Sequence, residues 1–182
     1  IKGWHTRQID FTLAYPQADI ECDMYMEIPL GFSFNGSRKT HVLLLIKNLY
    51  GQRQAGRTWQ QHLNKGLAEN GFTPSVADEC VWYHGKVTFM YYVDDGIFIG
   101  PCSKDIDKII NSLQRTFNLT DEGDLSDYLG IKVTHLPDNR ISLTQPHLIN
   151  DIINDMKFAK SIDHQRVRPL FRARPSLRRP RE

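Results

Sequence analysis

The chain has 182 residues, of which 40% are hydrophobic, 24% charged and 10% aromatic, and its formal net charge is +2. This length fits about one domain, and the composition excludes bulk disorder and fibrous repeats. The longest aliphatic run, residues 42–46, is far shorter than the ~18 apolar residues of a membrane-spanning helix. No membrane segment is therefore predicted.

Strands are predicted where β-branched and aromatic residues cluster between turn formers. In chain order these stretches are residues 7–15, 24–28, 42–49, 80–84, 87–93, 97–99, 128–134 and 140–144. Several lie close enough in sequence to form hairpins.

Three amphipathic helices are predicted among these strands. The first covers residues 57–70 and stops at Gly71, and the second has Ser103 as its N-cap and an apolar stripe that reaches Phe117. The third opens at Pro146 and reaches residue 156. Antiparallel hairpins with helices packed on one face predict an α+β two-layer domain.

The start of the chain and its cysteines predict an intracellular protein. It begins at Ile1 without a Met or a secretory signal pattern, which predicts an internal start within a longer polypeptide. Cys22, Cys80 and Cys102 are odd in number and form no C-x-x-C pair. Because Cys80 and His84 make only half of a zinc pattern, we expect reduced structural thiols.

Two adjacent carboxylates, Asp94 and Asp95, lie between two apolar strands. Asp95-Gly96 is a strong tight-turn dipeptide, so the pair is expected at a hairpin tip. Taken alone, the pair is typical of a turn in water. The apolar flanks instead favour a hairpin inside the sheet, where neighbouring like charges repel unless a cation separates them.

A third carboxylate, Asp10, lies in a strand-like segment, where an isolated charge is costly to bury. An ordinary strand-end residue is the alternative. Three converging carboxylates have the hard oxygen ligands that Mg²⁺ prefers. Two such ions form the clamp for in-line phosphoryl transfer, which points to polymerase or nuclease chemistry.

The residues around these carboxylates resemble a known family. Tyr92-Val93-Asp94-Asp95 matches the aromatic-x-Asp-Asp motif of reverse transcriptases, and its surroundings are similar to the copia-type (LTR) retrotransposon branch. The matching segments follow the family's order over roughly residues 3–156: residues 8–10, 25–32, 48–55, Trp59, 70–72, Asp78, Cys80 and 128–131. The resemblance implies a right-hand polymerase palm over residues 1–160, with truncated fingers and little or no thumb.

The resemblance also implies roles for the carboxylates and for one aromatic residue. Asp10, Asp94 and Asp95 would be catalytic and, with the carbonyl of Phe11, would bind two Mg²⁺ ions, for which Mn²⁺ is an alternative. Tyr15 matches the aromatic steric gate that excludes a 2′-hydroxyl; an aromatic closing a strand is the alternative. The family more often continues with Phe-Leu-Asn-Gly, where this chain reads Tyr15-Pro16-Gln17-Ala18.

Two further segments match functional parts of the family. Arg53 and Gln54 correspond to the nucleotide pocket, or are simply polar residues before a helix. Tyr128-Leu129-Gly130 corresponds to the primer-grip turn, or is a plain hydrophobic strand. Gly56 and Thr120 stand where the family often has Pro and Lys.

The resemblance thus implies an RNA-directed DNA polymerase that adds dNTPs to a primer on an RNA or DNA template. The alternative is a truncated, inactive remnant that folds as a palm and at most binds nucleic acid. Another palm-fold nucleotidyltransferase, such as a cyclase, would lack the reverse-transcriptase segments. The rest of the Pol polyprotein, with integrase and RNase H, is expected outside this chain, and the expected location is the cytoplasm or virus-like particles.

Residues 161–182 form an Arg/Pro-rich tail with seven Arg against Asp163 and Glu182. Its net charge is +5, so residues 1–160 carry −3. No stable fold is predicted for it. It is interpreted either as a basic arm for nucleic acid or, in preference, as a frameshift or mispredicted exon, because the resemblance fades at about Lys157.

Overall fold

The computed structural model describes residues 3–136 and 140–156. The chain divides into two units, Ile1–Thr144 and Gln145–Glu182. The second unit contains helix α4 (Pro146–Asp155), which starts at a proline as predicted. The basic tail predicted over residues 161–182 lies outside the described residues.

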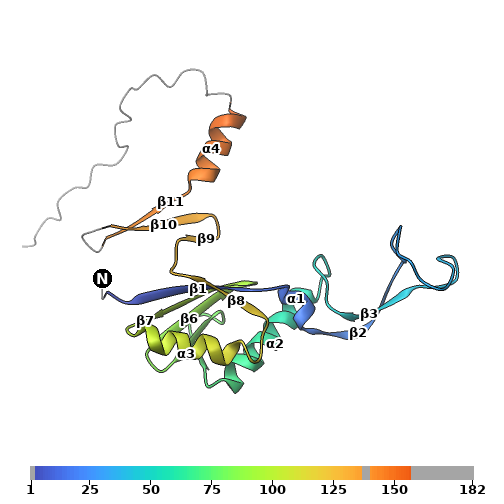
Figure 1. The fold of residues 1–182 in the computed structure, drawn as a ribbon, viewed down its shortest axis with the longest axis horizontal. Coiled ribbons are helices and arrows are strands. Elements are labelled where there is room, and N and C mark those ends of the chain that lie inside the picture. The colour runs from blue at the N-terminus through green and yellow to red at the C-terminus, as the bar shows by residue number, and fades with distance from the viewer. Residues whose placement is uncertain (1–2, 137–139, 157–182) are drawn as a thin grey trace, which may run out of the picture. The chain divides into compact units, whose positions relative to one another are not determined.

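The centre of the first unit is an antiparallel six-stranded sheet, drawn in Figure 1. Its strands, in spatial order, are β4 (Thr73–Pro74), β5 (Val81–His84), β6 (Val87–Tyr92), β7 (Asp95–Gly100), β1 (His5–Phe11) and β8 (Leu119–Gly123). The chain is therefore α+β with antiparallel pairing, as predicted. Strands β4 and β8 were not predicted, because their residues show little β-branched or aromatic enrichment.

Helices α2 (Ala55–Glu69) and α3 (Ser103–Leu113) lie on the same side of this sheet (Figure 1). The apolar residues of α2 recur one turn apart, which puts Trp59, Leu63 and Leu67 on one buried face. The helix ends in a Schellman motif at Gly71, whose φ is +83°. Both helices and the strands contribute to one hydrophobic cluster, and this cluster holds the helices against the sheet.

Two smaller sheets complete the first unit. The strands β2 (Asp19–Met26) and β3 (Leu43–Lys47) pair as an antiparallel ribbon. The strands β9 (Asp127–Tyr128), β10 (Ile131–His135) and β11 (Ile141–Thr144) form the other sheet. A short helix, α1 (Ala14–Gln17), follows β1 directly.

Several predicted boundaries were wrong. The strand predicted over residues 7–15 ends at Phe11, because Leu13 takes a left-handed φ of +52° and the chain enters α1. The N-cap of α3 is Cys102 rather than Ser103, and the helix ends at Leu113, before Phe117.

The predicted Asp95-Gly96 turn was also wrong. Asp95 pairs with Tyr92, so the hairpin turn is Val93-Asp94, and Gly96 lies inside β7. A Cβ on Gly96 would come within 2.7 Å of the Phe89 ring and 2.9 Å of Ile9. This glycine therefore serves close packing between strands, not a turn.

Candidate active site

The three predicted carboxylates lie at the same end of the central strands. The register of β1 and β7 pairs Asp10 directly with Asp95, and residues paired in this way have Cβ atoms about 4.5–5.5 Å apart. Asp94 precedes Asp95 in the hairpin turn, and its carbonyl accepts a 2.7 Å hydrogen bond from the backbone N–H of Phe11. All three side chains are half-buried.

The electrostatics at this end of the sheet disfavour ionisation of the carboxyl groups of Asp10 and Asp95. Burial, followed by the charges of Asp94 and Glu122, raises the pKa of Asp10 above its ordinary value. The pKa of Asp95 is raised by burial and then by Asp94, Asp10 and Glu122. Glu122, on β8, was missed by the sequence reasoning because that strand was not predicted.

The donor set fits Mg²⁺ by chemistry, since carboxylate oxygens are the ligands that this ion prefers and a cation would relieve the repulsion. Within residues 3–136 and 140–156, however, no three His, Cys, Asp or Glu side chains are gathered closely enough to hold a metal ion. The backbone thus brings the three positions together without closing their side chains into a cluster.

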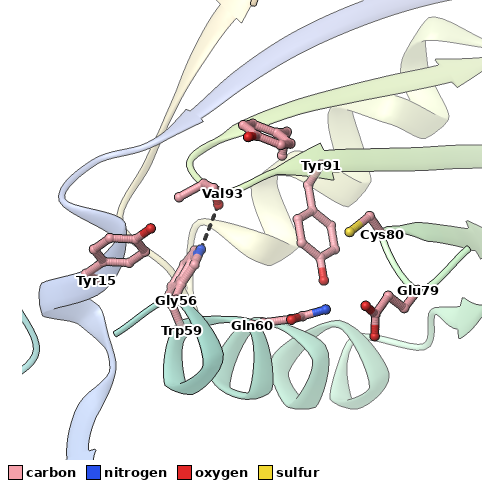
Figure 2. A pocket seen from close by; sticks show the side chains of 9 residues that line it. Tyr15, Gly56, Trp59, Gln60, Glu79, Cys80, Tyr91 and Val93 are labelled. Carbon is pink, nitrogen blue, oxygen red and sulfur yellow. Dashed lines mark hydrogen bonds between the residues drawn. The ribbon is translucent and has the colours of Figure 1, made fainter. Parts of the chain in front are cut away.

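The turn that carries Asp94 is strained and supported from α2. Val93 has a φ of +56°, which is rare for a β-branched residue and costs about 1–3 kcal/mol. The indole N–H of buried Trp59 donates a 2.7 Å hydrogen bond to the Val93 carbonyl, as Figure 2 shows. The sequence pattern predicts Trp59 only as part of an apolar helix face. The one signal that could have indicated a polar role is that a buried tryptophan needs a hydrogen-bond acceptor for its indole N–H.

Beside this bond lies a cavity of about 180 Å³ (Figure 2). Its lining includes Tyr15, Trp59, Cys80, Tyr91 and Val93, so it lies between α2 and the β6–β7 hairpin, next to the bond that joins them. The Cys80 thiol has a pKa raised by burial and by the charges of two neighbouring acids. It is therefore a poor nucleophile, in line with the structural role predicted for it.

Tyr15 occupies α1 and is half-buried. Its ring stacks at a tilt on Tyr50, with 4.5 Å between the ring centroids. The pKa of Tyr50 is raised by burial and then by the charge of Asp94, and the backbone of Ala14 hydrogen-bonds its phenol group. Tyr50 therefore lies within range of the charge of Asp94, and Tyr15 lies beside Tyr50.

The base of α1 is anchored to the strand-end backbone by Gln17. Its side chain donates to the carbonyls of Thr12 and Asn118 and accepts from the N–H of Asn118. This anchoring holds the helix that carries Tyr15 although the helix has only one turn.

The remaining predicted residues lie at two other places. Arg53 is exposed in the turn before α2, and the amide of Gln54 contacts the sulfur of Met24 on β2. Tyr128-Leu129-Gly130 forms the turn between β9 and β10, with positive φ at Leu129 and Gly130. Burial, and then the charge of Asp95, raises the pKa of Tyr128 to about 12, which places this phenol near the carboxylates.

The comparison with known families decides the identity of the chain. A sequence profile described as reverse transcriptase (RNA-dependent DNA polymerase) matches residues 1–167. The chain belongs to this reverse transcriptase family. This match continues beyond residue 156, the end of the region in which the family's motif segments were found in sequence.

Curated relatives of this reverse transcriptase are retrotransposon polyproteins. The Retrovirus-related Pol polyprotein from transposon RE1 of Arabidopsis thaliana is 32% identical, over 84% of this chain and 10% of its own length. The corresponding protein from transposon TNT 1-94 of Nicotiana tabacum is 29% identical, over 85% and 12%. The Transposon Ty1-BL Gag-Pol polyprotein of Saccharomyces cerevisiae is 26% identical, over 73% and 8%.

These relatives confirm the predicted resemblance to copia-type retrotransposon reverse transcriptases. The chain spans about a tenth of the length of the RE1, TNT 1-94 and RE2 polyproteins. No solved structure matches it. In the part of the chain that the structure describes, no helix combines the length and hydropathy that a bilayer crossing requires.

Proposed function

We propose that residues 1–160 are the palm, with part of the fingers, of an RNA-directed DNA polymerase that extends a primer with deoxynucleotides. One observation carries the proposal beyond family membership: the strand register that pairs Asp10 with Asp95 beside Asp94. Three half-buried carboxylates at one sheet end, with raised pKa values for two of them, favour a cation-binding role.

Asp10, Asp94 and Asp95, with the carbonyl of Phe11, would hold the metal. When bound, two Mg²⁺ ions would polarise the primer 3′-hydroxyl and neutralise charge on the leaving pyrophosphate. The strands β1 and β7 fix the spacing of Asp10 and Asp95, and the Phe11 N–H fixes the backbone of Asp94.

The aromatic residues beside the carboxylates would select the nucleotide. Tyr15, supported by Tyr50, would stand under the sugar and exclude a 2′-hydroxyl. Arg53 and Gln54 would contact the nucleotide, although the present contact of Gln54 with Met24 must then open. The Tyr128-Leu129-Gly130 turn would direct the primer end, which the closeness of Tyr128 to Asp95 supports.

The test is Mg²⁺-dependent extension of a DNA primer on an RNA template. We compare two proteins. One is the 182-residue chain, and the other is a chimera in which this chain replaces the matching region of the RE1 polyprotein. Asp94→Asn should lower the rate of extension by more than about 100-fold. Substituting a residue that only hydrogen-bonds to a metal ligand already lowers activity by about 10–100-fold, and Asp94 would be a ligand itself. Asp105→Asn, an exposed carboxylate on α3, is the matched control and should leave the rate unchanged.

Two outcomes would contradict the proposal. A parental chimera that fails to extend the primer, while the RE1 polyprotein does so, would indicate the inactive alternative, a palm that at most binds nucleic acid. Equal extension by Asp94→Asn and the parent would mean that the metal ligands are assigned wrongly.

A further inference from the structure

The turn between β6 and β7 needs support from outside itself. Val93 holds a left-handed backbone conformation, which its branched side chain disfavours. Such a conformation persists only where the surroundings enforce it. The next residue is Asp94, so any relaxation of this turn moves the carboxylate that the proposed chemistry needs most.

Two donors hold consecutive carbonyls of this turn. The indole N–H of Trp59 bonds the carbonyl of Val93, and the backbone N–H of Phe11 bonds that of Asp94, each at 2.7 Å. One donor comes from α2 and the other from β1. The turn is therefore held from the helix layer and from the sheet at once.

Trp59 is itself well fixed. Its side chain is 1% exposed, and its ring lies edge-on to Phe11 and Phe117 with centroid distances of 5.2 and 6.1 Å. Leu63 and Leu67, one and two turns further along, anchor the same helix face in the core. A donor held this rigidly restricts where the Val93 carbonyl can lie.

We propose that Trp59 is a positioning residue: its indole N–H holds the strained Val93 turn and so sets the place of the Asp94 carboxylate. The consequence for catalysis rests on the proposed polymerase function, whereas the positioning itself does not. Trp59 acts through the backbone of the turn, because its indole N–H bonds the Val93 carbonyl and its side chain is 1% exposed.

The chain contains a matched control for this residue. Trp82 is also buried, at 5% exposed, and its indole N–H also donates to a backbone carbonyl, that of Glu79, at 3.0 Å. Glu79 lies three residues before Trp82 and outside the hairpin turn. Replacing Trp82 by Phe thus removes the same kind of bond and a similar volume without touching the turn.

The experiment measures amide hydrogen exchange by NMR in the 182-residue chain. In Trp59→Phe, the Phe11 amide, which reports the turn through its bond to Asp94, should exchange about tenfold faster, since a hydrogen bond of ordinary strength is lost. The amides of Phe89 and Phe98, which are register partners in the middle of the hairpin, should change much less.

The control is Trp82→Phe. In this variant the exchange rate of the Phe11 amide, divided by the rates of the Phe89 and Phe98 amides, should stay as in the parent. Equal acceleration of all three amides in Trp59→Phe would overturn the proposal, because Trp59 would then be only a core residue.

A second substitution tests the link to strain. Glycine accepts positive φ without penalty, so Trp59→Phe/Val93→Gly should recover part of the lost protection at Phe11. Trp59→Phe/Val93→Ala keeps a Cβ and should recover less. If the alanine variant recovers as much as the glycine variant, strain at Val93 plays no part and the proposal is wrong.

Primer extension by the RE1 chimera separates this inference from the proposed function. Trp59→Phe should lower kcat about tenfold and leave KM for the dNTP unchanged, because a misplaced Asp94 affects the chemical step more than binding. A kcat equal to that of the parent would overturn the positioning role. If the parent does not extend the primer, the polymerase proposal fails, and the exchange of the Phe11 amide still decides the role of Trp59.

Discussion

Gly66 lies on the buried face of α2 against the ring of Phe117, and its replacement by alanine tests the packing beneath the candidate active site. An alanine Cβ at this position would overlap the Phe117 ring atoms. That ring is 3% exposed and is held in edge-on contacts by Phe11, Trp59 and His62, with centroids 5.6–6.1 Å away. It cannot move aside without displacing the cluster that supports the Val93 turn.

The magnitude follows from two opposing terms. Alanine in a helix interior gains about 1 kcal/mol over glycine, while overpacking a core typically costs about 1–3 kcal/mol. These terms leave a net cost of about 0–2 kcal/mol, and because the overlap is with a fixed ring we expect the upper end, about 2 kcal/mol. For a domain of this size, each kcal/mol lowers the Tm by about 2–4 °C.

Thermal unfolding followed by circular dichroism measures the effect, with Gly56→Ala as the matched control. Gly56 lies on the same helix, and the nearest atom to its added Cβ is the Tyr15 hydroxyl at 3.8 Å. Gly56→Ala should therefore raise the Tm slightly, by at most about 1 kcal/mol of stability. If Gly66→Ala raises the Tm as well, the Phe117 ring is not held as argued and the reasoning fails.

Three further predictions concern charge and selectivity. The pKa of Asp10 is raised in the fold, so its ionised form destabilises the metal-free protein once the pH rises above the ordinary pKa of 3.8. With a chelator present, Asp10→Asn should therefore raise the Tm at about pH 7. The gain should vanish below about pH 3.8, where the carboxyl is protonated in both states, and a lower Tm at neutral pH would contradict this. The pKa of His62 is lowered from 6.5, mainly by burial, so the urea midpoint should fall as pH drops below 6.5, and His62→Gln should flatten that slope. If Tyr50 supports Tyr15 as the sugar gate, Tyr50→Leu should raise the ratio of ribonucleotide to deoxynucleotide incorporation in primer extension. An unchanged ratio would mean that Tyr50 plays no part in sugar selection.

The family and the main helices were predictable because their signals are local. The spacing of Trp59, Leu63 and Leu67 specifies one apolar helix face, and Gly71 supplies the left-handed stop. The Tyr92–Asp95 motif and the ordered segments around it identified the reverse transcriptase family without any fold information. Composition, spacing and motif order need no knowledge of which distant residues meet.

The tertiary structure alone decided where the candidate site residues lie. The hairpin turn falls at Val93-Asp94 rather than at Asp95-Gly96, because Gly96 is needed inside the sheet, where Phe89 and Ile9 leave no room for a side chain. The pairing of Asp10 with Asp95 and the bond from Trp59 to the turn join residues far apart in the chain. Such register and close contacts are set by packing between strands and helices, and a local sequence pattern carries no record of them.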